Sequence, residues 1–301
     1  MPPRSKHRLA STLRLCSCRT TGNFDRGVCA IIPWSRQFAL EYSALFDGLL
    51  PALERLGLPI PLGGTSNHFR FSVLRDVGAW DPYNVTEDAD LGIRLARMGY
   101  RTATIASTTW EEAPTRWRIW LGQRTRWLKG WVQTWLVHMR RPGQLCREVG
   151  GWQFLGLQVV MGGVLLSVLV YPIALLALVL TWLLGGFADI DVGGPGRWLW
   201  IVALVNLAIG ILAPMLAAAF AVIRRGRAWL LPSVLGMPIY WLLISVAGYR
   251  ALLDLARLPF HWEKTRHGLG GAAVGTRTLP PPIKPPRAPT ATGMVLRRPV
   301  P

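Results

Sequence analysis

Two long stretches without a charged residue constrain this chain more than any other feature. Residues 149–188 and 198–223 contain no Asp, Glu, Lys or Arg. An apolar run of more than about 18 residues is long enough to cross a bilayer as a helix. The sequence therefore predicts an integral membrane protein with a soluble region ahead of its membrane region.

The membrane region is expected to span residues 151–258, with two or three hydrophobic segments. The first run, 152–184, contains Pro172. As a helix of roughly 30 residues it would be about 45 Å long, which exceeds one bilayer core. We therefore expect a short interfacial piece followed by one span, and a second span at 198–223.

The third apolar run, 230–249, contains Pro232 and Pro238, and basic residues follow it. A full crossing would place those basic residues outside, against the positive-inside tendency. The run is interpreted as a kinked re-entrant or interfacial segment, or as an additional pass.

The net charge of +18 is concentrated at the two ends of the chain and between the hydrophobic runs. This distribution is typical of the cytoplasmic side of a membrane protein. A nucleic-acid partner is not expected, because no basic face accompanies a known nucleic-acid-binding motif. The four cysteines are interpreted as free thiols in a reducing compartment, since they lack the spacing of a zinc site; they are Cys16, Cys18, Cys29 and Cys146.

The two ends of the chain carry little periodic pattern. Residues 1–34 are basic and lack the apolar core of a signal peptide, so they are predicted to be disordered or foreign to the domain. Residues 259–278 are predicted to form a cytoplasmic loop. Residues 279–301, which are rich in proline, are predicted to be a disordered tail.

Residues 35–113 are predicted to form a soluble domain. Apolar spacing from Phe38 to Leu53 indicates a helix. A turn at Gly64, Thr65 and Ser66 offers N–H and hydroxyl donors to a ligand, although an ordinary loop explains the same letters.

A second helix is expected to begin at Thr86. This threonine is a good N-cap, and Glu87 and Asp88 fall in the first turn. Acidic residues stabilise helix starts in many proteins, so the cluster alone does not identify a site. A strand is predicted at residues 101–106.

Residues 114–150 are predicted to contain an amphipathic helix and a linker. Five tryptophans of this helix fall within roughly 80° of arc; they are Trp117, Trp120, Trp127, Trp131 and Trp135. Gln123 and Arg126 lie on the neighbouring arc. Because tryptophan favours the lipid headgroup region, we interpret the helix as lying on the membrane surface, with a packed core helix as the alternative.

The order Thr86-Glu87-Asp88, then Gln123-Arg124-Thr125-Arg126-Trp127, then membrane helices resembles the processive family-2 glycosyltransferases. These include cellulose, chitin and hyaluronan synthases and related bacterial polysaccharide synthases. The resemblance covers about residues 35–267. It implies an α/β fold, a partial GT-A-type catalytic domain, followed by an interfacial helix and transmembrane α-helices.

The resemblance also implies roles for individual residues. Asp88 would be the catalytic base, kept ionised by the helix start. The residues expected to contact acceptor and donor are Gln123, Arg126, Trp127, Gly64, Thr65, Ser66 and Glu87. Trp262 and Thr265 would belong to a loop that closes over the nucleotide.

The chain departs from the family pattern ahead of residue 37. Members use Mg²⁺ or Mn²⁺ held by an Asp-x-Asp motif, but residues 1–36 contain only one acidic residue, Asp25. We therefore expect no metal ligands in this chain. It is expected to be the C-terminal two thirds of such an enzyme, without the nucleotide-binding half.

These observations predict an inverting glycosyltransferase that extends a β-linked polysaccharide from a nucleotide sugar, with a UDP-sugar as the expected donor. Its partners would be this donor, a glycan acceptor and the lipid bilayer. It would be a multi-pass protein of the bacterial inner membrane with a cytoplasmic catalytic part. One alternative is a non-catalytic pseudoenzyme or subunit that lacks its own donor site. A channel or transporter is disfavoured, because the two clear spans offer few polar residues beyond Ser167 and Asn206.

Overall fold

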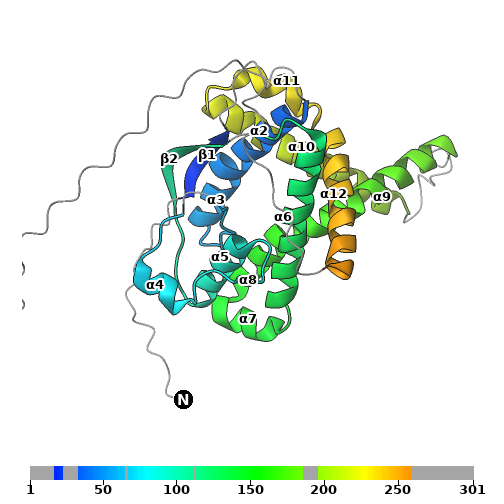
Figure 1. Cartoon of the computed structure of the whole chain (residues 1–301). Coiled ribbons are helices and arrows are strands. Elements are labelled where there is room, and N and C mark those ends of the chain that lie inside the picture. Colours follow the sequence, from blue (N-terminus) through cyan, green and yellow to red (C-terminus); the bar gives the residue numbers. More distant parts are fainter. Residues whose placement is uncertain (1–16, 23–32, 65–66, 112, 186–195, 259–301) are drawn as a thin grey trace, which may run out of the picture. The chain divides into compact units, whose positions relative to one another are not determined.

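The computed structural model of the chain describes residues 17–22, 33–64, 67–111, 113–185 and 196–258. Helices dominate this part (Figure 1). In it, strands β1 (Ser17–Gly22) and β2 (Thr104–Glu111) form a two-stranded parallel sheet. The expected α/β fold of GT-A type is not shown by this structure.

Strand β1 lies within residues 1–34, for which the sequence predicts disorder, and helix α2 also begins there, at Pro33. The partner of β1 is β2, more than 80 residues later. Pairing at this separation leaves no local pattern in the sequence, which explains why the strand is not anticipated.

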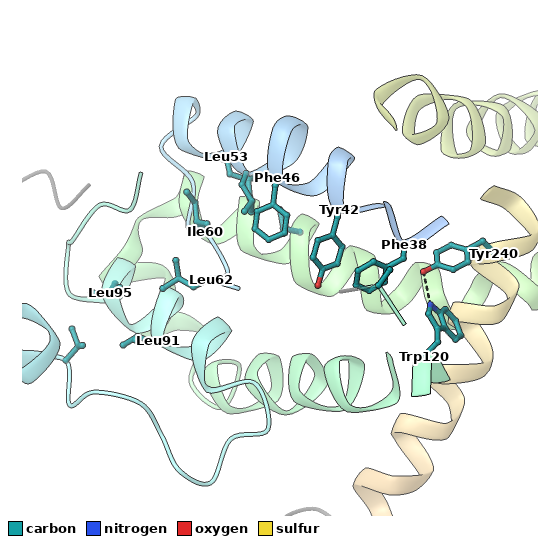
Figure 2. Packing of buried hydrophobic residues seen from close by; sticks show 14 of the residues in the cluster. Phe38, Tyr42, Phe46, Leu53, Ile60, Leu62, Leu91, Leu95, Trp120 and Tyr240 are labelled. Atoms are coloured by element: carbon teal, nitrogen blue, oxygen red, sulfur yellow. Dashed lines mark hydrogen bonds between the residues drawn. The ribbon is translucent and has the colours of Figure 1, made fainter. Parts of the chain in front are cut away.

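The soluble core is built on the helix that apolar spacing predicts. It comprises α2 (Pro33–Ala44), a π-helical turn η1 (Leu45–Leu49) and α3 (Leu50–Arg55). Its inward-facing residues recur at three- and four-residue spacing and pack with residues of the following loop and of α5 (Figure 2). These buried residues are Phe38, Tyr42, Phe46, Leu50, Leu53, Ile60, Leu62, Leu91 and Leu95.

Helix α5 (Glu87–Arg97) is held tightly in this core, next to the short helix α4 (Phe71–Asp76). A Cβ built on Gly92 would lie 2.3 Å from the Ile60 carbonyl oxygen, so only glycine allows this approach. Arg94 donates hydrogen bonds to the carbonyl oxygens of Val77 and Ala79, at 2.6 and 2.7 Å. Helix α5 is therefore fixed relative to the rest of the soluble region through its middle and last turns.

Helix α6 (Trp117–His138) follows, and then α7 (Pro142–Val149). All five tryptophans of the α6 stripe are buried or partly buried in the protein. Trp120 is fully buried, and Trp131 and Trp135 pack against the cluster around Ile93 and Leu145. This packing resembles the core-helix alternative, and contact of α6 with lipid stays a prediction.

Within the described residues, three helices are long and apolar enough to cross a membrane. The first runs from Gly151 to Leu183 through α8 (Gly151–Leu157), a π-helical turn η2 (Gln158–Gly162) and α9 (Gly163–Leu183). The others are α10 (Gly196–Arg224) and α12 (Met237–Arg257). Between them lie a 3-10 turn η3 (Ala228–Leu230) and the short helix α11 (Leu231–Val234).

Two prolines behave differently from expectation. Pro172 lies inside α9 without ending it, so the first apolar run is one continuous helix. Pro238 lies in the first turn of α12, where a missing N–H costs nothing. The third run therefore contains a helix that is long and apolar enough to cross a membrane, which fits the alternative of an additional pass.

The apolar helices are joined to each other and to the soluble region by specific contacts. The Val168 side chain of α9 fills the space over Gly248 of α12, where a Cβ would lie 2.4 Å from it. At the end of α10, Arg225 forms an ion pair with Asp47 of η1. This pair fixes that end of α10 to the soluble region.

Candidate active site

The candidate site is centred on the start of α5, where Thr86 occupies the N-cap position. The sequence predicts that its hydroxyl caps the helix, but the structure shows no such hydrogen bond. The hydroxyl is instead buried without a hydrogen-bond partner in the described structure. The reason is the contact with α6, because a Cβ on Gly130 would lie 2.4 Å from the Thr86 Oγ1 atom. Asn84 supports the turn instead, accepting a hydrogen bond from the Thr86 N–H at 3.0 Å and donating one to the Thr134 hydroxyl at 2.8 Å.

Asp88 lies in the first turn of α5, partly buried. Its Oδ1 atom accepts a hydrogen bond from the Ala89 N–H at 2.9 Å. Its Oδ2 atom faces the loop at Gly64, where a built Cβ would lie 3.1 Å away. The glycine therefore leaves room for the loop to pass close to the carboxylate.

Burial raises the pKa of Asp88 from 3.8 to about 6, and the negative charge of Glu87 adds to the rise. The hydrogen bond from Ala89 and the positive charge of Arg126 act in the opposite direction but do not cancel it. Burial, and not the position at the helix start, therefore has the largest effect on the pKa of Asp88, contrary to the sequence-based expectation. The carboxylate is still mostly ionised near pH 7, and it is more basic than an ordinary aspartate.

The second motif lies on α6, which packs against the start of α5. Gly130 and Thr134 contact the turn that precedes α5. Gln123 and Trp127 lie on the same face of α6, two turns and one turn earlier. Arg126 lies on the neighbouring arc, and its charge reaches Asp88. The structure thereby brings the two motifs together.

Gln123 and Thr125 each carry a buried side-chain oxygen without a hydrogen-bond partner in the described structure. A buried polar atom left in this state costs about 1–3 kcal/mol. A bound ligand with hydroxyl groups would offset that cost.

Trp127 is partly buried against α2, with its ring centroid 6.4 Å from that of Phe38 and 6.2 Å from that of Tyr42. The Arg124 guanidinium lies 4.8 Å from the centroid of the Trp127 ring. The orientation of this indole is therefore set by protein contacts.

Arg124 belongs to a buried polar cluster that we call the Glu41 cluster, formed by Glu41, Arg124, Tyr240 and Trp120. Glu41 accepts hydrogen bonds from Arg124 at 2.6 Å and from the Tyr240 hydroxyl at 2.9 Å. Trp120 donates its indole N–H to the same hydroxyl at 3.1 Å (Figure 2). Burial by itself would lower the pKa of Arg124, but the charge and hydrogen bond of Glu41, together with the nearby Tyr240 and Tyr42, hold the pKa above its usual range.

A second buried pair, formed by Asp90 in the first turn of α5 and His138 of α6, also supports α5. Asp90 accepts hydrogen bonds from His138 at 2.9 Å and from Arg94 at 2.7 Å. Burial by itself would raise the pKa of Asp90, but the bonds and charges of these two partners lower it. Arg97 donates to the other ring nitrogen of His138 at 3.0 Å, so His138 donates through Nε2.

Other predicted site residues are less well defined by the structure. Glu87 is exposed beside Asp88. Thr65, Ser66, Trp262 and Thr265 lie outside the described residues. The sequence does not identify Glu41, Arg124 and Gly130 as supports of the site. The many aromatic residues near Arg124 along α6 are the one signal that could have pointed to the role of Arg124.

The described part of the chain contains no group of three or more His, Cys, Asp or Glu side chains that could hold a metal ion. At the candidate site, the side chain of Glu87 is exposed and that of the neighbouring Asp88 is partly buried. The residues described do not fit a divalent metal site, and no step proposed below uses one. A metal requirement of the reaction stays a prediction.

Comparison with known proteins gives a consistent result. A family described as glycosyl transferase family group 2 matches residues 34–255, which is 222 of the 301 residues. The chain belongs to this family. The matched range of this glycosyltransferase family includes α2, α5 and α6 and all three candidate membrane helices except the last residues of α12.

This family-2 chain is also similar to a probable glycosyltransferase of Bacillus subtilis (strain 168), YdaM, with 40% identity over 68 residues. The aligned part covers 22% of this chain and 16% of that protein, so the chain matches about a sixth of the relative's length. No solved structure matches the chain. Both sequence comparisons support a transferase.

Proposed function

We propose that the chain carries the acceptor side of an inverting glycosyltransferase, a partial GT-A-type domain beside a membrane. It would transfer a sugar from a nucleotide sugar, with a UDP-sugar as the expected donor, to a growing β-linked polysaccharide. The observation that supports this most strongly is the position of Asp88. This basic carboxylate lies beside Gly64 and within reach of the charge of Arg126.

The proposed reaction is a single displacement. The Asp88 carboxylate takes the proton of the acceptor hydroxyl while that oxygen attacks the anomeric carbon of the donor. The bond from this carbon to the diphosphate oxygen breaks, and the leaving nucleoside diphosphate keeps the electron pair. Attack from the face opposite the leaving group inverts the anomeric configuration.

Three residues of α6 fit the two sides of this reaction. The Arg126 guanidinium suits the developing charge on the diphosphate, because its fork is always protonated. The unpartnered Gln123 Oε1 atom suits a sugar hydroxyl donor. Trp127 offers an apolar ring surface to a sugar. Glu87, Thr65, Ser66, Trp262 and Thr265 remain proposed contacts by resemblance.

The proposal is tested by Asp88→Asn in the full chain, assayed in membranes with a panel of labelled UDP-sugars. Asn keeps the shape of Asp but cannot accept the proton, so transfer should fall by about 100-fold or more. The control is Asp76→Asn, an isosteric change at an exposed carboxylate of α4. The anomeric configuration of the product, read by nuclear magnetic resonance, should be inverted.

Retention of the full rate by Asp88→Asn would refute Asp88 as the base. Absence of transfer by the native chain with every donor, in membranes where it is folded, would favour the non-catalytic subunit instead. The two results are distinct, because the first requires activity and the second excludes it.

A further inference from the structure

The corner between α6 and α7 forms a basic pocket that the proposed reaction does not use. It has a volume of about 360 Å³ and is lined by Arg97, Val137, His138, Arg140, Arg141 and Gln144. We define these six residues as the corner pocket.

The charge of the corner pocket is not balanced by the protein around it. Arg97 is paired with Glu148 at 2.6 Å, and His138 is hydrogen-bonded to Asp90. Arg140 and Arg141 are exposed, and within the described part of the chain neither guanidinium forms an ion pair. Two uncompensated charges therefore line a hollow that already contains a third guanidinium.

The local backbone favours the same sign of ligand. Helix α7 begins at Pro142, directly after Arg141, so the positive end of its dipole adjoins the pocket. Gln144, in the first turn of α7, adds an amide to the lining. Arginine forks and an amide are suited to the oxygens of a phosphate group.

The pocket lies close to the beginning of the first apolar helix. Met139, which follows His138, contacts Gln158 of η2 through its sulfur at 3.3 Å. Exposed apolar side chains of this helix include Leu155 and the adjacent Val159, and they continue along α9 with Leu166 and Val170. At the pocket itself, Val137 is exposed beside Leu136. Basic groups therefore adjoin an apolar surface that is suited to acyl chains.

We propose that the corner pocket binds the phosphate headgroup of an anionic phospholipid. A basic cluster next to a membrane helix attracts anionic lipid through charge. The exposed Leu136 and Val137 and the apolar surface of α9 favour a lipid over a free phosphate, because only a lipid contacts both kinds of surface. The site is separate from Asp88, and its test does not depend on transferase activity.

The test uses the purified full chain in nanodiscs of phosphatidylcholine with or without phosphatidylglycerol, and native mass spectrometry counts the retained lipid. Arg140→Gln combined with Arg141→Gln should weaken retention of phosphatidylglycerol about 30-fold, because each guanidinium near an anionic surface contributes roughly a factor of five. Arg140→Lys with Arg141→Lys keeps the charge and should retain most of the lipid.

The matched control is Arg70→Gln with Arg75→Gln, which removes two exposed charges at α4. It should retain phosphatidylglycerol like the native chain. Equal retention by the corner-pocket variant and this control would overturn the proposal. So would arginine-dependent binding of inorganic phosphate or UDP without selective retention of phosphatidylglycerol. The variants should unfold at the same temperature as the native chain, because both arginines are exposed, and thermal unfolding checks this.

Discussion

At the scale of single residues, Asp88 combines a chemical role with a cost to the fold. Its carboxylate is placed where burial opposes ionisation, and the helix start and Arg126 recover only part of the loss. A proposed base with a pKa near 6 accepts a proton more readily than an ordinary aspartate, yet remains mostly ionised at neutral pH. The same burial that suits catalysis therefore makes the charged protein less stable.

This cost predicts a pH-dependent gain in stability for Asp88→Asn. The pKa is 3.8 in the unfolded chain and about 6 in the folded one, so the folded protein binds more protons between these values. The contribution of protonated Asp88 to the stability of the folded protein is fully present below pH 3.8 and is lost as the pH rises through 6. Above pH 6 the variant should be more stable than the native chain by about 2–3 kcal/mol. Denaturant titration measures this difference in unfolding free energy between variant and native chain. The difference should be larger at about pH 8 than at about pH 5, which lie on either side of the folded pKa.

The transferase rate should follow the same ionisation in the opposite sense. Only the carboxylate form of Asp88 can take the acceptor proton, so the rate should rise with pH and level off above about pH 6. Rate profiles of the native chain at saturating donor test this. A limb that falls with rising pH through this range would contradict the role of base.

The Glu41 cluster gives a third prediction at this scale. Glu41→Gln leaves the Arg124 guanidinium buried without a negative partner, which should destabilise the chain by about 3–5 kcal/mol. Tyr240→Phe removes the hydroxyl that accepts from Trp120 and should cost about 1–3 kcal/mol. Thermal unfolding in one detergent measures both. Because Glu41 bonds both groups, the double variant should lose less than the two single losses combined, and strict additivity would show that the cluster does not act as a unit.

At the scale of elements, the crossing of α5 and α6 joins the two motifs. The helices approach closely only because residue 130 has no side chain. Gly130→Ala would place a methyl group within the Thr86 side chain and separate the helices, moving Gln123 and Arg126 away from Asp88.

We expect Gly130→Ala to reduce transfer more than about tenfold and to destabilise the chain by about 1–3 kcal/mol. Gly48→Ala is the matched control, because a Cβ there meets nothing within 4 Å. Both are measured by transfer assay and thermal unfolding. A Gly130→Ala variant with the native rate would show that the helix crossing does not set the site geometry.

Elements with local patterns could be predicted from the sequence, whereas those that depend on distant contacts could not. The apolar spacing from Phe38 predicts the helix that α2, η1 and α3 form. Pro232 and Pro238 leave the third apolar run open between a kinked segment and an additional pass. A proline disrupts the interior of a helix but is accommodated in its first turn, which is where Pro238 lies in α12. Strand β1 was missed because its partner is far away in the chain.

The candidate site divides in the same way. Asp88 and the stretch from Gln123 to Trp127 form short local patterns, and the structure brings them together. Arg124 lies within that stretch, but its partner Glu41 is 83 residues earlier. No local pattern shows this pairing, since it arises only when α2 packs against α6.

At the scale of the whole molecule, the ion pair between Asp47 and Arg225 fixes the soluble region to the end of α10 that carries three arginines. From the positive-inside tendency we predict that this end faces the cytoplasm. If α10 crosses the membrane, its other end at Gly196 faces the opposite side.

Cysteine labelling tests this topology in a variant without the four native cysteines. Gly196→Cys and Ala228→Cys each introduce a thiol at an exposed position. A membrane-impermeant maleimide should label residue 196 in intact bacterial spheroplasts, and residue 228 only after permeabilisation. Labelling of both positions from one side would show that α10 does not cross.

The Glu41 cluster has a consequence for how such a chain can change in evolution or be re-engineered. Its hydrogen bonds join the motif-bearing α6 to α2 of the soluble region and to α12 of the membrane region. A chimaera that takes its catalytic half from one protein and its last membrane helix from another would leave the Arg124 charge facing a foreign surface. We therefore expect exchange of these parts between relatives to succeed only when Glu41, Arg124 and Tyr240 move together.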